Sequence, residues 1–133
     1  HRAAGPQLLE FCKTLNGCNT GQAKISPGFN LPAKHVIHTV GPVWHGGNRN
    51  EAVLLESCYR ESLKLAALHK VETIAFPAIS CGVYGYPIEE AVQIAVKTCK
   101  EWLNQKSSSL AVIYCCFDPE MKEKYLDVCK HAN

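Results

Sequence analysis

The sequence lacks the features that mark several specialised classes of protein. No apolar run approaches the roughly 20 residues of a membrane-spanning helix, and no basic segment followed by a short apolar core indicates a signal peptide. The net charge is only +2 over 133 residues, too small for a strong electrostatic footprint on duplex DNA or anionic lipid. We therefore expect neither a membrane nor duplex nucleic acid as a partner, whereas one local anionic ligand is compatible with this charge.

The sequence also has no CxxC pair, although it contains eight cysteines. Cys115 and Cys116 are adjacent in a strand-like run and would point to opposite faces, as would His35 and His38, so neither pair converges on one ion. We expect no metal site and no cofactor. Reduced core thiols in a cytoplasmic protein explain this pattern better than a disulfide or metal framework, the alternative that an even cysteine count raises.

Alternating apolar patterns predict one α/β domain over residues 1–133, with a largely parallel sheet between helices. We expect strands at 23–29, 35–40, 73–79 and 110–117, and helices at 7–15, 50–70, from Pro87 to about Lys106, and after Asp118. Asp118 should cap the last helix, and the continuously apolar strand 110–117 should be covered on both faces. The inner face of the helix over 50–70 should carry Leu55, Cys58, Tyr59, Ser62, Leu63 and Ala66.

The segment FPAISCGVYGYP, residues 76–87, runs from a buried strand through two glycines into a helix. Gly82 and Gly85 allow backbone conformations closed to other residues and let a ligand approach bare peptide N–H groups. The following helix adds the positive end of its dipole, so the segment suits an anion such as phosphate. It lacks the Walker lysine and the GxGxxG spacing, and an ordinary tight turn is the alternative.

This segment closely resembles the macrodomain family, in particular its MacroD-type branch of ADP-ribose hydrolases and O-acetyl-ADP-ribose deacetylases. Three further motifs carry the same resemblance in the same order: HRAAGPQLLEFC at the start, NGCNTGQAKIS, and LPAKHVIHTVGPVW. The resemblance covers the whole chain. It implies a three-layer α/β/α sandwich that binds ADP-ribose or O-acetyl-ADP-ribose, with mono-ADP-ribosylated proteins as further partners.

By position, the resemblance also implies a binding site. The diphosphate would be wrapped by backbone N–H groups of Ser80, Cys81, Gly82, Val83 and Tyr84. Tyr84 would also lie against the distal ribose, Phe117 would stack on adenine, and the floor would be formed by Pro77, Ala78 and Ile79. The family often has threonine at the position of Cys81, which matters little if the contact is through the backbone. No histidine lies near Cys81 in the sequence to act as a base, so we do not expect a thiolate nucleophile.

These residues also have plainer interpretations. Tyr84 and Tyr86 could cover the edge of the core, Phe117 could be an ordinary core aromatic, and Ser80 could cap a turn.

The chain departs from the family pattern at its start. Family members carry, before the segment that matches HRAAGP, an Asn-rich strand end and a Gly-rich loop with the aspartate that helps to position the attacking water. Because the chain begins at His1, we expect an N-terminally truncated domain whose catalytic aspartate lies upstream. A central strand between residues 35–40 and 73–79 would also be missing, which would leave unpaired backbone groups on both neighbours.

Two functions compete, and the first is an enzyme. In its complete form it would hydrolyse ADP-ribose esters by deacetylating O-acetyl-ADP-ribose and releasing mono-ADP-ribose from proteins, with no metal and no covalent intermediate. The alternative is a non-catalytic reader module that binds ADP-ribose, and a third candidate is a remnant that binds nothing. For the chain as it stands we expect weak ADP-ribose binding, negligible hydrolysis and poor folding, because two strand edges would be exposed.

Overall fold

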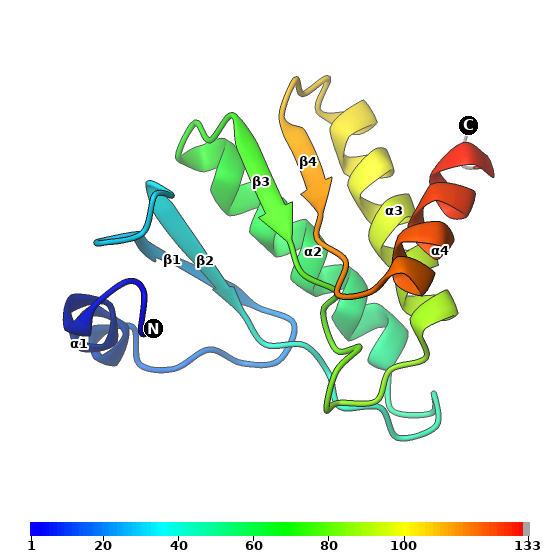
Figure 1. The fold of residues 1–133 in the computed structure, drawn as a ribbon, viewed down its shortest axis with the longest axis horizontal. Helices are drawn as coiled ribbons and strands as arrows, with labels where there is room; N and C mark the ends of the chain where they lie inside the picture. Colours follow the sequence, from blue (N-terminus) through cyan, green and yellow to red (C-terminus); the bar gives the residue numbers. More distant parts are fainter. Residues whose placement is uncertain (132–133) are drawn as a thin grey trace.

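The computed structural model describes residues 1–131, whose helices and strands follow one another in the expected order (Figure 1). The helices are α1 Pro6–Thr14, α2 Glu51–Leu68, α3 Ile88–Gln105 and α4 Pro119–His131, and the strands are β1 Ala23–Pro27, β2 His35–Thr39, β3 Thr73–Phe76 and β4 Ala111–Tyr114. The predicted α/β class is confirmed. None of the helices described within this range combines the length and apolarity needed to cross a bilayer.

The strands form two separate pairs within residues 1–131. Strands β1 and β2 are antiparallel, with Ala23 opposite Thr39, whereas β3 and β4 are parallel, with Thr73 opposite Ala111. Strands β2 and β3 belong to different sheets, so each has one edge without a strand partner among the described residues. This agrees with the expectation of a gap between segments 35–40 and 73–79.

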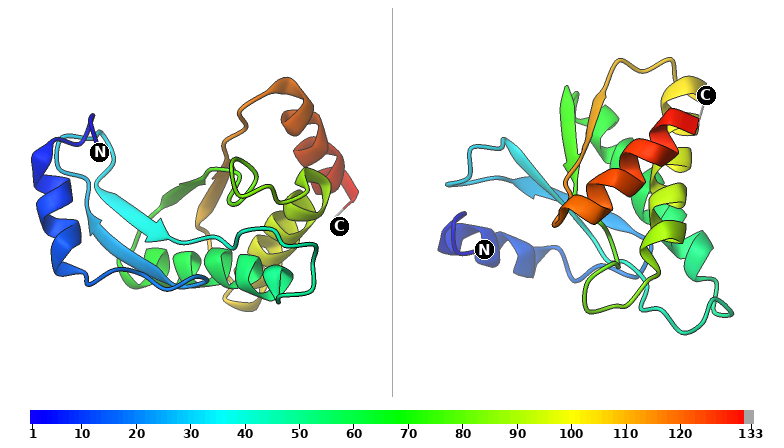
Figure 2. Two further views of the ribbon diagram at one scale, coloured as in Figure 1. Left: turned by 90° about the horizontal axis from the view of Figure 1, so that it is seen from below. Right: turned by 45° about the vertical axis from the view of Figure 1, so that its right-hand side comes forward.

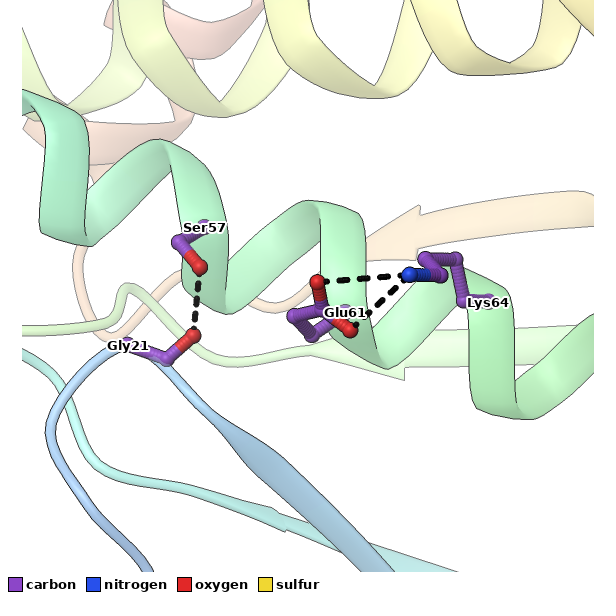
Figure 3. A network of polar contacts seen from close by, with 4 residues as sticks. All are labelled: Gly21, Ser57, Glu61 and Lys64. Atoms are coloured by element: carbon purple, nitrogen blue, oxygen red, sulfur yellow. Dashed lines mark hydrogen bonds and ion pairs between the residues drawn. The ribbon is translucent and has the colours of Figure 1, made fainter.

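Helix α2 connects the two strand pairs. It packs against β1 and β2 and also against α3, and it runs beneath both sheets in the left view of Figure 2. The hydroxyl of Ser57 donates a hydrogen bond of 2.6 Å to the carbonyl oxygen of Gly21, which ties the helix to the turn before β1 (Figure 3). The nearby Glu61–Lys64 ion pair at 3.4 Å lies on the surface and contributes little to stability.

The buried faces of α2 and α3 form most of the core. The predicted inner face of α2 is confirmed at all six positions, and Glu51 is buried in addition. The helix pattern predicts an inner stripe for α3 of Ala91, Ile94, Ala95, Thr98, Cys99 and Trp102. The observed inner face is wider, because Val92 and Val96 are also buried, while Ile94 is only partly buried. Pro87 is the N-cap of α3, not its first residue as expected, and its ψ of 124° is extended. A proline at either position leaves the hydrogen bonds of the helix intact.

The prediction that segment 110–117 is covered on both faces is wrong. Ala111 and Ile113 are exposed, as are their partners in register, Thr73 and Ala75, so this face of the sheet is open among the described residues. The other face packs against helices: Phe76 contacts Tyr59 of α2, and Tyr114 stacks on Tyr125 of α4, with ring centroids 4.8 and 4.9 Å apart. Among the described residues, helices therefore cover one face of the β3–β4 sheet and leave the other open.

All eight cysteines are free thiols, but they are not all core residues. Cys58 and Cys99 are buried, whereas Cys115, Cys116 and Cys129 are exposed. The expectation of core thiols is therefore wrong for these three. Cys115 and Cys116 lie beyond the end of β4, where the chain leaves the packed face of the sheet.

The predicted cap of the last helix is confirmed. One carboxylate oxygen of Asp118 accepts the N–H of Met121 at 2.7 Å, and Met121 itself is fully buried. Replacing Asp118 by alanine should therefore lower the free energy of unfolding by about 1 kcal/mol. Urea denaturation monitored by circular dichroism measures this loss. Asp118→Ser, which keeps a capping oxygen, should lose much less, and equal losses would show that the cap contributes nothing.

Candidate functional site

A cleft of about 1130 Å³ opens between the unpaired edges of β2 and β3, in the gap where the family resemblance implies a further strand. Both strands line it, together with Ser62 from α2 beneath and the segment that follows β3. Five of the predicted ligand-binding residues line the cleft: Pro77, Ala78, Ile79, Ser80 and Tyr84. The lining does not include Cys81, Gly82, Val83 or Phe117.

The segment after β3 is folded by its own backbone. The N–H of Cys81 donates to the carbonyl of Ala78, that of Gly85 to Gly82, and that of Tyr86 to Ser80, at 3.2, 3.0 and 2.9 Å. Ser80 adopts a left-handed conformation with φ of 67°, which is uncommon for a residue with a side chain. Such an observed strain supports a functional role for the turn.

Two features of this turn suit a ligand. Within residues 1–131, the main-chain N–H groups of Gly82, Val83 and Tyr84 donate to no protein acceptor. All three residues are exposed, and Val83 is fully open to solvent. The hydroxyl oxygen of Ser80 is buried, and it too has no hydrogen-bond partner among the described residues. A buried polar group without a partner destabilises the free protein, and an incoming polar ligand can satisfy it.

The segment 41–50 supports the same turn from the other side. The N–H of Trp44 donates to the carbonyl of Tyr84 at 2.8 Å, and the Trp44 ring packs on the ring of Tyr86 with centroids 4.7 Å apart. Tyr86 is buried, so its plainer interpretation as a residue that covers the core is the correct one. Tyr84, by contrast, is 39% exposed and lines the cleft.

The remaining predicted residues occupy distinct environments. Phe117 is 61% exposed, so the alternative of an ordinary core aromatic is wrong. It follows β4, whose pairing with β3 is extended by the N–H of Cys115 donating to the carbonyl of Phe76 at 2.8 Å. Burial raises the pKa of the Cys81 thiol, which keeps it protonated at neutral pH and argues against a thiolate nucleophile.

Glu51 is the residue near the site that the sequence interpretation missed. Its side chain is 1% exposed, and its carboxylate accepts three backbone N–H groups, from His45, Gly47 and Arg49, at 2.8, 2.9 and 2.6 Å. Burial acts to raise the pKa of Glu51, but these hydrogen bonds outweigh it and lower the pKa to about 2. An acidic residue in the first turn of the helix after Gly46 and Gly47 was the available signal.

The lowered pKa predicts an acid dependence of stability. Because the folded-state pKa of Glu51 lies below the ordinary value of 4.5, its contribution is complete above pH 4.5 and is lost as the pH falls toward 2. Glu51→Gln should therefore melt below the wild type at pH 7, and this difference should shrink steadily below pH 4.5. Thermal melts of both proteins across this range measure it. A difference that stays constant with pH would contradict the assignment.

Comparison with known proteins identifies the family. The family model described as "Macro domain" matches residues 1–95. The chain belongs to the macrodomain family. It is 58% identical over 132 residues to a macro domain-containing protein of Chlorobaculum tepidum, covering 99% of this chain and 74% of that protein.

Further relatives and solved structures show the same likeness. An O-acetyl-ADP-ribose deacetylase of Enterobacter cloacae is 53% identical over 129 residues, covering 94% of this chain and 72% of that protein. A solved mutant macrodomain of Oceanobacillus iheyensis with ADPR superposes with a TM-score of 0.91 at 40% identity, covering 99% of this chain and 74% of the other. The predicted family and macrodomain fold are therefore confirmed.

Proposed function

We propose that this macrodomain binds ADP-ribose beyond the carboxyl end of β3, with the diphosphate held by the turn from Ser80 to Tyr84. The observation that carries the proposal is the run of three main-chain N–H groups, from Gly82 to Tyr84, that have no protein acceptor among residues 1–131. The start of α3 at Ile88 adds a positive dipole end to the same segment. The structural relative with ADPR and the deacetylase relatives support the choice of ligand.

The turn suits a diphosphate by its chemistry. Backbone N–H groups that converge in a short turn bind anions without needing a charged side chain. Tyr84 lines the cleft next to these donors and would lie against the distal ribose, while Ile79 and Ala78 supply an apolar floor. The buried Ser80 hydroxyl would gain a partner from the ligand.

We further propose that the protein in its complete form hydrolyses ADP-ribose esters, deacetylating O-acetyl-ADP-ribose and releasing mono-ADP-ribose from proteins. Such hydrolysis needs a water held beside the ester and a group that orients it. Among the described residues that line the cleft, the only carboxylate belongs to Glu72. Glu72 precedes β3, whereas Ser80 follows β3, so the two residues flank opposite ends of the strand. This placement favours, for residues 1–131 alone, the second candidate function: a reader that binds ADP-ribose without hydrolysing it.

The two functions separate in one pair of measurements on residues 1–133. Isothermal titration with ADP-ribose tests binding, and release of acetate from O-acetyl-ADP-ribose tests hydrolysis. We expect saturable binding, with AMP binding more weakly because it lacks the diphosphate. Release of acetate far above the buffer rate would assign the enzyme to this chain, whereas absence of ADP-ribose binding by the folded protein would overturn the proposal.

A further inference from the structure

Glu51 is the only acidic residue among the described residues that is fully buried, and it forms no ion pair there. Its partners are instead three backbone N–H groups within five residues of chain, those of His45, Gly47 and Arg49. Both carboxylate oxygens are used: one accepts from His45 and Gly47, the other from Arg49. The carboxylate therefore fixes the path of segment 45–49, which forms no helix or strand of its own.

Segment 45–49 directly follows Trp44, which contacts the proposed binding turn. Trp44 directly precedes His45, its N–H donates to the carbonyl of Tyr84 at 2.8 Å, and its ring packs on Tyr86. The charge of Glu51 is close enough to Tyr86 to contribute to the raised pKa of that phenol, after burial and Glu90. Trp44 thus joins the segment that Glu51 holds to the proposed binding turn.

We propose that Glu51 is a positioning residue for the ligand-binding turn: by fixing segment 45–49 it holds Trp44 against Tyr84 and Tyr86. The free N–H groups of Gly82 to Tyr84 then keep the orientation in which they meet the diphosphate. This inference rests on the proposed function. It adds that the affinity for ADP-ribose depends on a buried carboxylate at the start of α2 that does not line the ligand cleft.

The site requires a carboxylate and not merely a polar side chain. A carboxylate has lone pairs for three donors and no hydrogen of its own, which matches the three N–H groups around Glu51. A glutamine amide has one acceptor oxygen and would direct its NH₂ group at one of these donors. A buried N–H left without an acceptor is costly, so segment 45–49 should move away.

The test compares Glu51→Gln with Leu63→Ala in the chain as it exists. Leu63 is fully buried on the same helix, twelve residues further along, and it does not line the cleft. Both variants should melt at a lower temperature than the wild type, so Leu63→Ala controls for loss of stability. All measurements are made at a temperature at which both variants are folded by circular dichroism.

The first readout needs no ligand. Backbone hydrogen exchange of the N–H groups of Trp44 and Tyr86, which are bonded to Tyr84 and Ser80, reports whether the turn is held in place. Relative to the exchange of core amides in the same variant, we expect these two groups to exchange at least about tenfold faster in Glu51→Gln and unchanged in Leu63→Ala. Unchanged exchange in Glu51→Gln would overturn the proposal.

The second readout is the dissociation constant for ADP-ribose. We expect Glu51→Gln to bind about tenfold or more weakly, Leu63→Ala to stay within about twofold, and Glu51→Asp, which keeps the charge, to fall between wild type and Glu51→Gln. Equal affinity in wild type and Glu51→Gln would overturn the inference, as would an equal loss in Leu63→Ala. If the wild type itself does not bind, the proposed function fails, whereas the exchange experiment still decides whether Glu51 holds the turn.

Discussion

Replacing Gly82 by valine should abolish ADP-ribose binding while leaving the melting temperature close to that of the wild type. A Cβ built on Gly82 meets no atom within 4 Å, and the backbone there does not adopt the left-handed region that favours glycine. The free protein therefore accommodates a side chain at this position. The same open space is where the proposed diphosphate must approach the N–H groups of residues 82–84, and a branched side chain would fill it.

The matched control is Cys81→Thr, one residue earlier in the same turn. Cys81 does not line the cleft, and its proposed contact is through the main chain, so this variant should bind ADP-ribose within a few-fold of the wild type. Calorimetric titration of both variants, after melting curves have shown that they are folded, measures the effect. Similar losses for the two would show that side chains, not the backbone, hold the ligand.

The helices could be predicted closely because their signals are local. The inner face of α2 follows from the spacing of six residues, and the start of α4 follows from Asp118 followed by Pro119. Whether a strand is covered on both faces is harder to predict than the position of a helix. Apolar composition shows that a strand can be buried, but not that a second layer of structure is present to bury it. Strand β4 is apolar throughout, yet Ile113 is half-exposed, since helices α2 and α4 pack on the opposite face of the sheet.

The site was predictable to the extent that it follows the chain. Pro77, Ala78, Ile79, Ser80 and Tyr84 are nearly consecutive, and the rule that ligands bind beyond the carboxyl ends of strands places them at one cleft. Glu51 was not predictable in this way, because its partners belong to an irregular segment whose path only the folded structure shows. The support that Trp44 gives to Tyr84 likewise joins residues forty positions apart.

Phe117 provides the second large expected effect. At 61% exposure its ring has little packing to lose, so Phe117→Ala should change the melting temperature only slightly. If the ring stacks on adenine as the macrodomain resemblance implies, its removal should weaken ADP-ribose by about 1–3 kcal/mol, which is roughly five- to 150-fold in affinity. Phe117→Tyr keeps the aromatic face and should bind like the wild type.

Phe117 does not line the cleft in the free protein, so its stacking on adenine needs a direct test. An exposed aromatic beyond the end of β4 can reach adenine only if the base extends out of the cleft past that strand. ADP-ribose and ribose 5-phosphate, compared by calorimetric titration, separate the two cases, since only the first carries the base. In Phe117→Ala the advantage of ADP-ribose over ribose 5-phosphate should shrink, while binding of ribose 5-phosphate itself stays unchanged. If both ligands bind the alanine variant as they bind the wild type, adenine stacks elsewhere and Phe117 is not a ligand-binding residue.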